Sequence, residues 1–121
     1  MNFSAAIKAH ANWRLRLSTY CQGNPKETGV DTQTLGQDNA CDLGKWLYGE
    51  GQRYASDPRF GELVNIHTAF HRHAAEIAAM AQSGKRKEAE TLINSNDSQF
   101  AKTSVQVVGI LMKFRTQYGD Q

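Results

Sequence analysis

The chain has 121 residues, enough for one domain around one hydrophobic core and too few for a separate catalytic domain beside it. Its 14 basic and 12 acidic residues give a formal net charge of +2, far from the strongly basic surface of most nucleic-acid-binding proteins. No stretch approaches the roughly 20 consecutive apolar residues of a membrane span, and the N-terminus lacks the apolar core of a signal peptide. The sequence therefore predicts a single domain over residues 1–121 that lies in the cytoplasm and contacts neither nucleic acid nor a membrane.

The first predicted helix covers residues 3–22. Its larger apolar residues recur at a helical period, and His10 lies on the same apolar stripe. Cys21 is on nearly the same face as His10 but about 16 Å further along the helix axis, too far to share one metal ion. We therefore interpret Cys21 as a small buried apolar residue. Residues 23–38 follow without periodicity and are rich in Gly, Pro, Asn, Asp and Thr, which predicts a long loop.

A second, short helix is expected after this loop. Asp38 can serve as its N-cap, and the helix should end near residues 49–51, where two glycines occur. It carries Cys41 in its first turn, where free backbone N–H groups and the helix dipole should lower the pKa of the thiol. A lowered pKa would favour the thiolate that a metal ion requires.

The rest of the chain predicts further helices. Asp57 followed by Pro58 marks the start of a third helix that ends near Gly84. Residues 86–94 predict a short helix and residues 98–118 a long last one. The apolar residues expected to face inward on the last helix are Val105, Val108, Leu111, Met112 and Phe114. No segment alternates as a strand would, so the predicted fold class is all-α: a four-helix bundle with an additional short helix and a long loop between the first and second helices.

Three of the four histidines fall within the third predicted helix, in the stretch NIHTAFHRH of residues 65–73. His67 and His71 lie one turn apart on its apolar face, whereas His73 points about 200° away from His71. Two imidazoles at this spacing can bind one tetrahedral metal ion. Histidines at the edge of the core that bond to carbonyl groups would give the same pattern.

Two more metal-ligating side chains are available on other helices, His10 on the first and Cys41 on the second. One thiolate and three neutral imidazoles would fill a tetrahedral zinc site and leave no position for water, which argues against catalysis. Trp13 and Trp46 follow these two residues closely in the sequence. We expect them to be large core residues that form an apolar wall around the ion.

In these positions the sequence resembles the chemoreceptor zinc-binding (CZB) domain family. The pattern of that family is a histidine with an aromatic residue three positions later, a cysteine leading into Leu-Gly-x-Trp, and then H-x-x-x-H. Here the three parts are His10 with Trp13, CDLGKW from Cys41 to Trp46, and HTAFH from His67 to His71. The resemblance implies a four-helix bundle, a zinc ion held by His10, Cys41, His67 and His71, and a symmetric homodimer.

The resemblance also implies a regulatory function rather than an enzymatic one. Members of the family are mostly modules of bacterial cytoplasmic proteins, attached to chemoreceptor signalling domains or to diguanylate cyclases, and they resemble sensors of zinc or of oxidants. In this chain the Cys41 thiolate would be the redox-sensitive group. The chain would be either a domain cut from a larger protein or a stand-alone member that signals through a partner protein.

Three other functions fit parts of the pattern. A metallohydrolase also uses a helical histidine pair, but it places a general-base glutamate where this chain has Thr68. A di-iron oxygen carrier needs bridging carboxylates at helical spacing from its histidines, and His10, His67 and His71 have none. The third is a zinc ion that only stabilises the bundle. The sequence does not distinguish this structural zinc from a sensor, so it stays as the alternative.

Overall fold

Helices form nearly all the regular structure of residues 1–23 and 33–120, the part of the chain that the computed structural model describes, and this part contains no strand. The helices in chain order are α1 (Phe3–Ala11), α2 (Trp13–Cys21), α3 (Asp42–Leu47), the 3₁₀ helix η2 (Glu50–Tyr54), α4 (Pro58–Gln82), α5 (Arg86–Asn94) and α6 (Gln99–Tyr118). The prediction of an all-α helical bundle is confirmed. Of the predicted loop over residues 23–38, residues 24–32 lie outside the described part.

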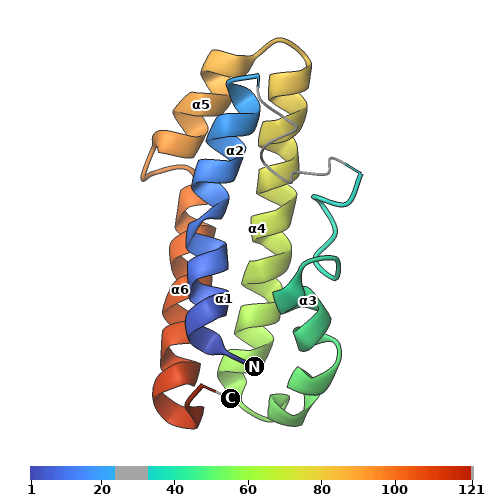
Figure 1. Cartoon of the computed structure of the whole chain (residues 1–121), viewed down its shortest axis with the longest axis vertical. Helices are drawn as coiled ribbons and strands as arrows, with labels where there is room; N and C mark the ends of the chain where they lie inside the picture. The colour runs from blue at the N-terminus through green and yellow to red at the C-terminus, as the bar shows by residue number, and fades with distance from the viewer. Residues whose placement is uncertain (24–32, 121) are drawn as a thin grey trace.

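Three rods run along the long axis of the molecule: α1 with α2, α4, and α6 (Figure 1). α6 packs against both α1 and α4, while α5 packs against α2 and α4. α3 and η2 lie beside α4, outside the three rods (Figure 1). The space between the rods is filled by fully buried side chains, the largest being Phe3, Phe70 and Phe114. None of the described helices has both the length and the apolar composition needed to span a membrane.

Several helix ends follow directly from local sequence. Asn2, Asp57 and Ser98 are the N-caps of α1, α4 and α6, and each side chain accepts a hydrogen bond from a backbone N–H of the first turn. Pro58 takes the first position of α4, where its missing N–H costs nothing. Gly84 has a φ of +88°, a left-handed conformation that ends a helix, so α4 stops where the sequence predicts.

The predicted first helix, residues 3–22, is divided at Asn12 into α1 and α2. The interruption is slight because the backbone of Asn12 stays in the right-handed helical region. Its N–H donates to the carbonyl of Lys8, and its own carbonyl accepts from the N–H of Arg16. α1 and α2 therefore lie end to end as one rod (Figure 1), and His10 and Trp13 stay on the same inner side.

The predicted N-cap of the second helix is wrong. α3 begins at Asp42, and Cys41 is the N-cap, with an extended backbone and a sulfur that accepts from the N–H of Gly44 at 3.4 Å. The carboxylate of Asp38 instead accepts from the hydroxyls of Tyr48 and Thr68. Contacts with other elements thus decide between two side chains that can both cap a helix, and they place Cys41 before the first turn rather than in it.

The predicted inner face of the last helix is partly wrong. Leu111 and Phe114 are buried as expected, but Val105 and Met112 are 71% and 45% exposed, and Val108 is only partly buried. The buried stripe of α6 includes Thr103, Val107, Ile110, Leu111 and Phe114. These residues recur at spacings of three and four, whereas Val105 and Met112 lie on another side of the same helix.

Candidate metal centre

Four side chains from three segments meet between α1, α3 and α4. They are His10 of α1, Cys41 at the N-cap of α3, and His67 and His71 of α4. One potential ligand atom from each lies within 4.8 Å of the others. The three histidines are at most 2% exposed, whereas Cys41 is only partly buried. The structure thus brings together all four residues that the sequence predicts as ligands.

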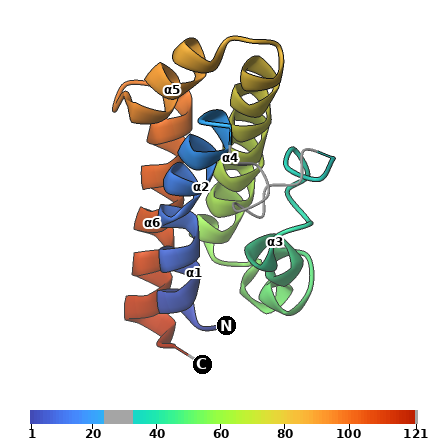
Figure 2. The same ribbon diagram turned by 45° about the horizontal axis from the view of Figure 1, so that its top comes forward.

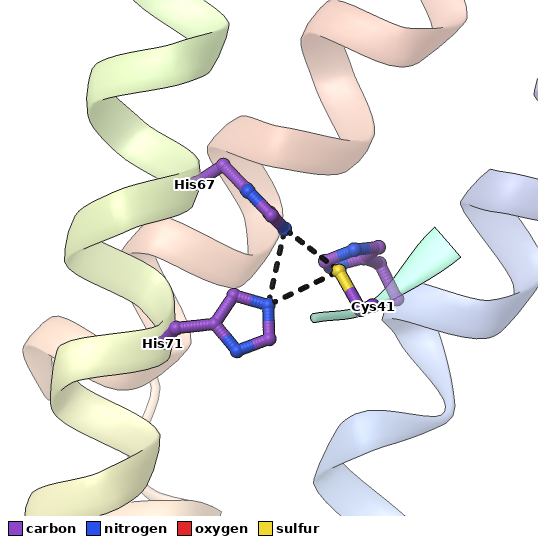
Figure 3. Close-up of side chains that lie close together, drawn as sticks. Cys41, His67 and His71 are labelled. Carbon is purple, nitrogen blue, oxygen red and sulfur yellow. Dashed lines mark hydrogen bonds between the residues drawn. The ribbon is translucent and has the colours of Figure 1, made fainter. Parts of the chain in front are cut away.

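His67 and His71 of α4 both point their Nε2 atoms at the sulfur of Cys41 (Figure 3). The sulfur lies 3.3 Å from Nε2 of His67 and 3.4 Å from Nε2 of His71, and the two nitrogens are 3.0 Å apart. A tetrahedral zinc ion with ordinary bond lengths would separate these atoms by about 3.3–3.6 Å. The spacing of Cys41, His67 and His71 is close to this, and the fourth ligand atom, from His10, lies within 4.8 Å of the others, so the set fits a single zinc ion.

The orientation of His71 is fixed by a contact outside the cluster. Its Nδ1 lies 2.9 Å from the carbonyl oxygen of Leu35, and because a carbonyl only accepts, Nδ1 carries the proton and donates. The lone pair of Nε2 is then free to face the cluster, an arrangement typical of metal-binding histidines. Leu35 is itself buried, so the segment before α3 contributes directly to the site.

Burial keeps the histidines neutral. It lowers the pKa of His10 and of His67 to about 3, with a smaller contribution from the charge of His71. Burial also lowers the pKa of His71, although the bond to Leu35 and the carboxylate of Asp38 oppose the shift. At neutral pH these three imidazoles therefore carry lone pairs, and a metal ion need not displace a proton from them.

The thiol of Cys41 behaves differently from the sequence prediction. Burial raises its pKa, and the backbone N–H groups of Gly44 and Leu43, which favour the thiolate, do not outweigh burial. The expected lowering of the pKa by the helix start is thus wrong for the metal-free site. Cys41 is protonated at neutral pH until a cation joins the cluster, so its proton is the one that metal binding must release.

The two tryptophans occupy different places. The ring of Trp13 is 5.9 Å from that of His71 and forms an apolar wall of the site. Trp46 packs on Phe3 and Phe60, at 5.7 and 6.3 Å between ring centres, and so fixes α3 against the core.

Two further residues that could bind a metal ion lie outside the cluster. His73, which the sequence places on the other side of α4, has its Nδ1 3.5 Å from a carboxylate oxygen of Glu76. Cys21 is 1% exposed and packs in the hydrophobic core as expected. Neither belongs to the group of potential ligands, so the structure separates them from His71 and Cys41.

Two features near the site were missed from sequence. The Oδ2 atom of Asp38 accepts from Tyr48 at 2.5 Å and from Thr68 at 2.6 Å, which ties the segment before α3 to α4 beside His67. Gly44 is the glycine of the CDLGKW motif, and a Cβ there would lie 1.8 Å from the carbonyl oxygen of Asp38. The glycine is therefore needed for close approach of two backbone segments, a role that its place in the motif could have suggested.

Comparison with known protein families matches residues 10–78, which hold all four clustered side chains, to the chemoreceptor zinc-binding domain. Comparison with curated proteins and with solved structures gave no match. The matched interval is more than half of the 121 residues, and the geometry of the cluster suits zinc, the metal of that family. The chain belongs to the chemoreceptor zinc-binding domain family, a regulatory rather than a catalytic family with zinc as its cofactor.

Proposed function

We propose that this domain is a sensor in which His10, Cys41, His67 and His71 hold one zinc ion and Cys41 responds to oxidants or to the supply of zinc. The observation that carries this proposal is the cluster itself, in which three buried imidazoles and the sulfur of the partly buried Cys41 come within 4.8 Å of one another. A set of four protein ligands closes the coordination sphere. The site therefore suits regulation better than hydrolysis, which needs an open position for water.

When bound, zinc supplies the positive charge that keeps the Cys41 thiol deprotonated. The thiolate can then take one oxygen atom from a two-electron oxidant such as a peroxide, which is reduced to water or an alcohol while the sulfur becomes a sulfenate. A sulfenate is a weaker donor than a thiolate. The segment that carries Cys41 would lose its link to α4 through the metal site, and this is the change that an output domain could read.

The setting of this sensor follows from its family. We propose a cytoplasmic location and an output domain or partner protein of the chemoreceptor or diguanylate cyclase type. The alternative is a zinc ion that only stabilises the bundle. The burial of the three histidines would also suit this role.

One experiment separates the two. Purified protein is analysed for zinc, and its zinc affinity is measured by competition with a chelator before and after stoichiometric peroxide. We expect one zinc ion per chain, modification of Cys41 before Cys21 by mass spectrometry, and weaker zinc binding with altered amide exchange over residues 36–47 afterwards. If Cys41 is fully oxidised and neither quantity changes, the structural alternative replaces the sensor.

We also propose that two copies associate through the first and last helices. Val105 and Met112 lie two turns apart on one side of α6, and Leu15 of α2 is 64% exposed. Exposed apolar residues on these helices are typical of an interface. Sedimentation should give a dimer for the parent protein and a monomer for Val105→Lys with Met112→Lys. Leu92→Lys on α5 is the control, and a monomeric parent protein would contradict the proposal.

A further inference from the structure

A groove of about 560 Å³ lies beside the metal centre, between α1 and residues 34–46. Figure 2 shows α1 and α3 on the two sides of this region. Its α1 wall includes three alanines, Ala5, Ala6 and Ala9, whose short side chains leave the space open. Leu35 and Leu43 line it from the other side. The groove is thus partly apolar and lies against the cluster.

The groove reaches the cluster on one side only. Cys41, His10 and His71 are among its lining residues, whereas His67 is 0% exposed and does not line it. Cys41 is also the one member of the cluster that is only partly buried. Cys41 thus combines partial exposure with a place on the wall of the groove.

Charges at the groove favour some reactants over others. Asp42 follows Cys41 directly, and it lines the groove together with Glu50. Arg16 is a cation among the lining residues, and its guanidinium stacks on Trp13, 3.8 Å from the ring centre. A negatively charged reactant that approaches the sulfur would meet a carboxylate of like charge. A small uncharged reactant would meet the alanines and leucines of the walls.

We propose that this groove is the route by which small uncharged oxidants reach Cys41, and that Asp42 slows anionic ones. This inference rests on the proposed redox function, since it names the entry path and the reactant class for the same sulfur. Ala9 is the point at which the route can be closed, because it is exposed on the α1 wall.

The first test compares two alanines of α1 that are both exposed. Ala9 lines the groove and Ala11 does not. Metal-free protein is treated with methyl methanethiosulfonate, an uncharged reagent. The thiolate attacks its sulfenyl sulfur, forms a mixed disulfide and releases methanesulfinate. The rate at Cys41 is followed by mass spectrometry. We expect Ala9→Trp to slow the reaction roughly tenfold and Ala11→Trp to leave it within about twofold, because access limits thiol reactivity.

A second pair of variants tests the opposite wall of the groove. Gln37→Trp fills it there, and Asn39→Trp is the control, since both residues are exposed but only Gln37 lines the groove. Circular dichroism and zinc affinity confirm that each variant is folded with an intact site. Parent-like rates in both Ala9→Trp and Gln37→Trp, or equal slowing in their controls, would overturn the proposed route.

The second test concerns charge. The rate with anionic sulfonatoethyl methanethiosulfonate is divided by the rate with the uncharged reagent, a ratio from which the pKa of the thiol cancels. We expect a ratio of roughly one tenth in the parent protein and a rise toward one in Asp42→Asn, because the repelling charge is gone. An unchanged ratio would remove Asp42 from the proposal. If the groove variants behave as expected but peroxide leaves zinc affinity unchanged, the sensor fails and the route stands.

Discussion

α4 and the segment of residues 33–48 both bring side chains to the metal centre, but they hold them by different means. α4 has 25 residues, packs against α5 and α6, and keeps His67 and His71 at 0% and 2% exposure. The segment contains only the six-residue α3, and Cys41 precedes that helix. Its polar contacts with α4 include the bond from His71 to Leu35, the bond from Thr68 to Asp38, and the approach of the Cys41 sulfur to both histidines of α4.

This difference divides the ligands of one site between a firmly held part and a less firmly held part. The histidines are fixed by long helices before any metal arrives, so most of the ordering cost of the site is met by folding. Leu43 and Leu47 anchor α3 in the core, whereas Leu35 is the one buried side chain of residues 33–41, so this part has fewer core contacts. In the proposed sensor, a change at Cys41 would move this part while the bundle stays intact.

The largest effect is expected from acid, which lowers stability through the histidines that the long helices hold. The pKa values of His10 and His67 fall from 6.5 to about 3 on folding, so between these limits the unfolded chain binds protons that the folded one does not. Stability present above pH 6.5 is therefore lost as the pH falls, by up to about 1.4 kcal/mol per pH unit for each histidine. Urea unfolding of the metal-free protein from pH 7 to pH 4 measures this loss. A flat stability profile would contradict buried, neutral histidines.

Removal of single ligands compares the two regions directly. Changes around a metal site that leave its ligands intact cost about 10–100-fold in affinity, so His67→Ala should weaken zinc binding by more than about 100-fold. Cys41→Ala should weaken it too but leave the bundle intact, because the three histidines stay in place. His73→Ala is the matched control on α4 and should bind zinc normally. Equal losses from His71→Ala and His73→Ala would show that the ligand assignment is wrong.

Two glycines test the regions with the same substitution. In Gly44→Ala the new Cβ would meet the backbone of Asp38 and Asn39, so the segment must shift and Cys41 with it. We expect zinc affinity to fall roughly tenfold, as for other changes that reorient a ligand. Gly61 of α4 is exposed and has nothing within 4 Å of the added Cβ. Gly61→Ala should raise the free energy of unfolding by up to about 1 kcal/mol and leave zinc affinity unchanged. Parent-like zinc binding by Gly44→Ala would show that the close approach is not needed.

Most of the long helices could be predicted because their signals are local. Asp57, Pro58 and Gly84 bound α4 through side-chain and backbone preferences that need no knowledge of the fold. The apolar period of α6 was less informative, since it has apolar residues on more than one side. Whether Val105 or Val107 faces inward depends on how α1 and α4 pack against it.

In the metal centre, too, some features follow from local sequence and others depend on packing. His67 and His71 share a face by helical geometry alone, and motif spacing adds His10 and Cys41. Local sequence could not place the N-cap, because the hydroxyl of Thr68 on another helix engages Asp38 and leaves the cap to Cys41. It also could not give the pKa of the thiol, since that value depends on burial by distant segments.

The smallest effect is expected at Asp38, which joins the two regions. A zinc ion with one thiolate and three neutral imidazoles carries a net charge of about +1, and the nearby carboxylate would favour it. In the metal-free site the same carboxylate already acts to raise the pKa values of His67 and His71. Asp38→Asn removes the charge but keeps an oxygen that can accept from Tyr48 and Thr68. We expect roughly fivefold weaker zinc binding at low salt and a smaller loss at high salt, because ions screen a partly exposed charge.

Thr68→Val is the complementary variant, since it breaks the link to α4 and keeps the carboxylate. It should leave zinc affinity within about twofold, because an exposed hydrogen bond contributes little net free energy. It should nevertheless speed amide exchange over residues 36–41, because the bond between Thr68 and Asp38 is one of the links that hold this stretch against α4. If Thr68→Val weakens zinc binding as much as Asp38→Asn does, and salt changes neither loss, Asp38 acts as a tether and its charge is irrelevant to the metal. The charge would then have to be balanced elsewhere, and the 33–48 segment would control affinity through its position alone.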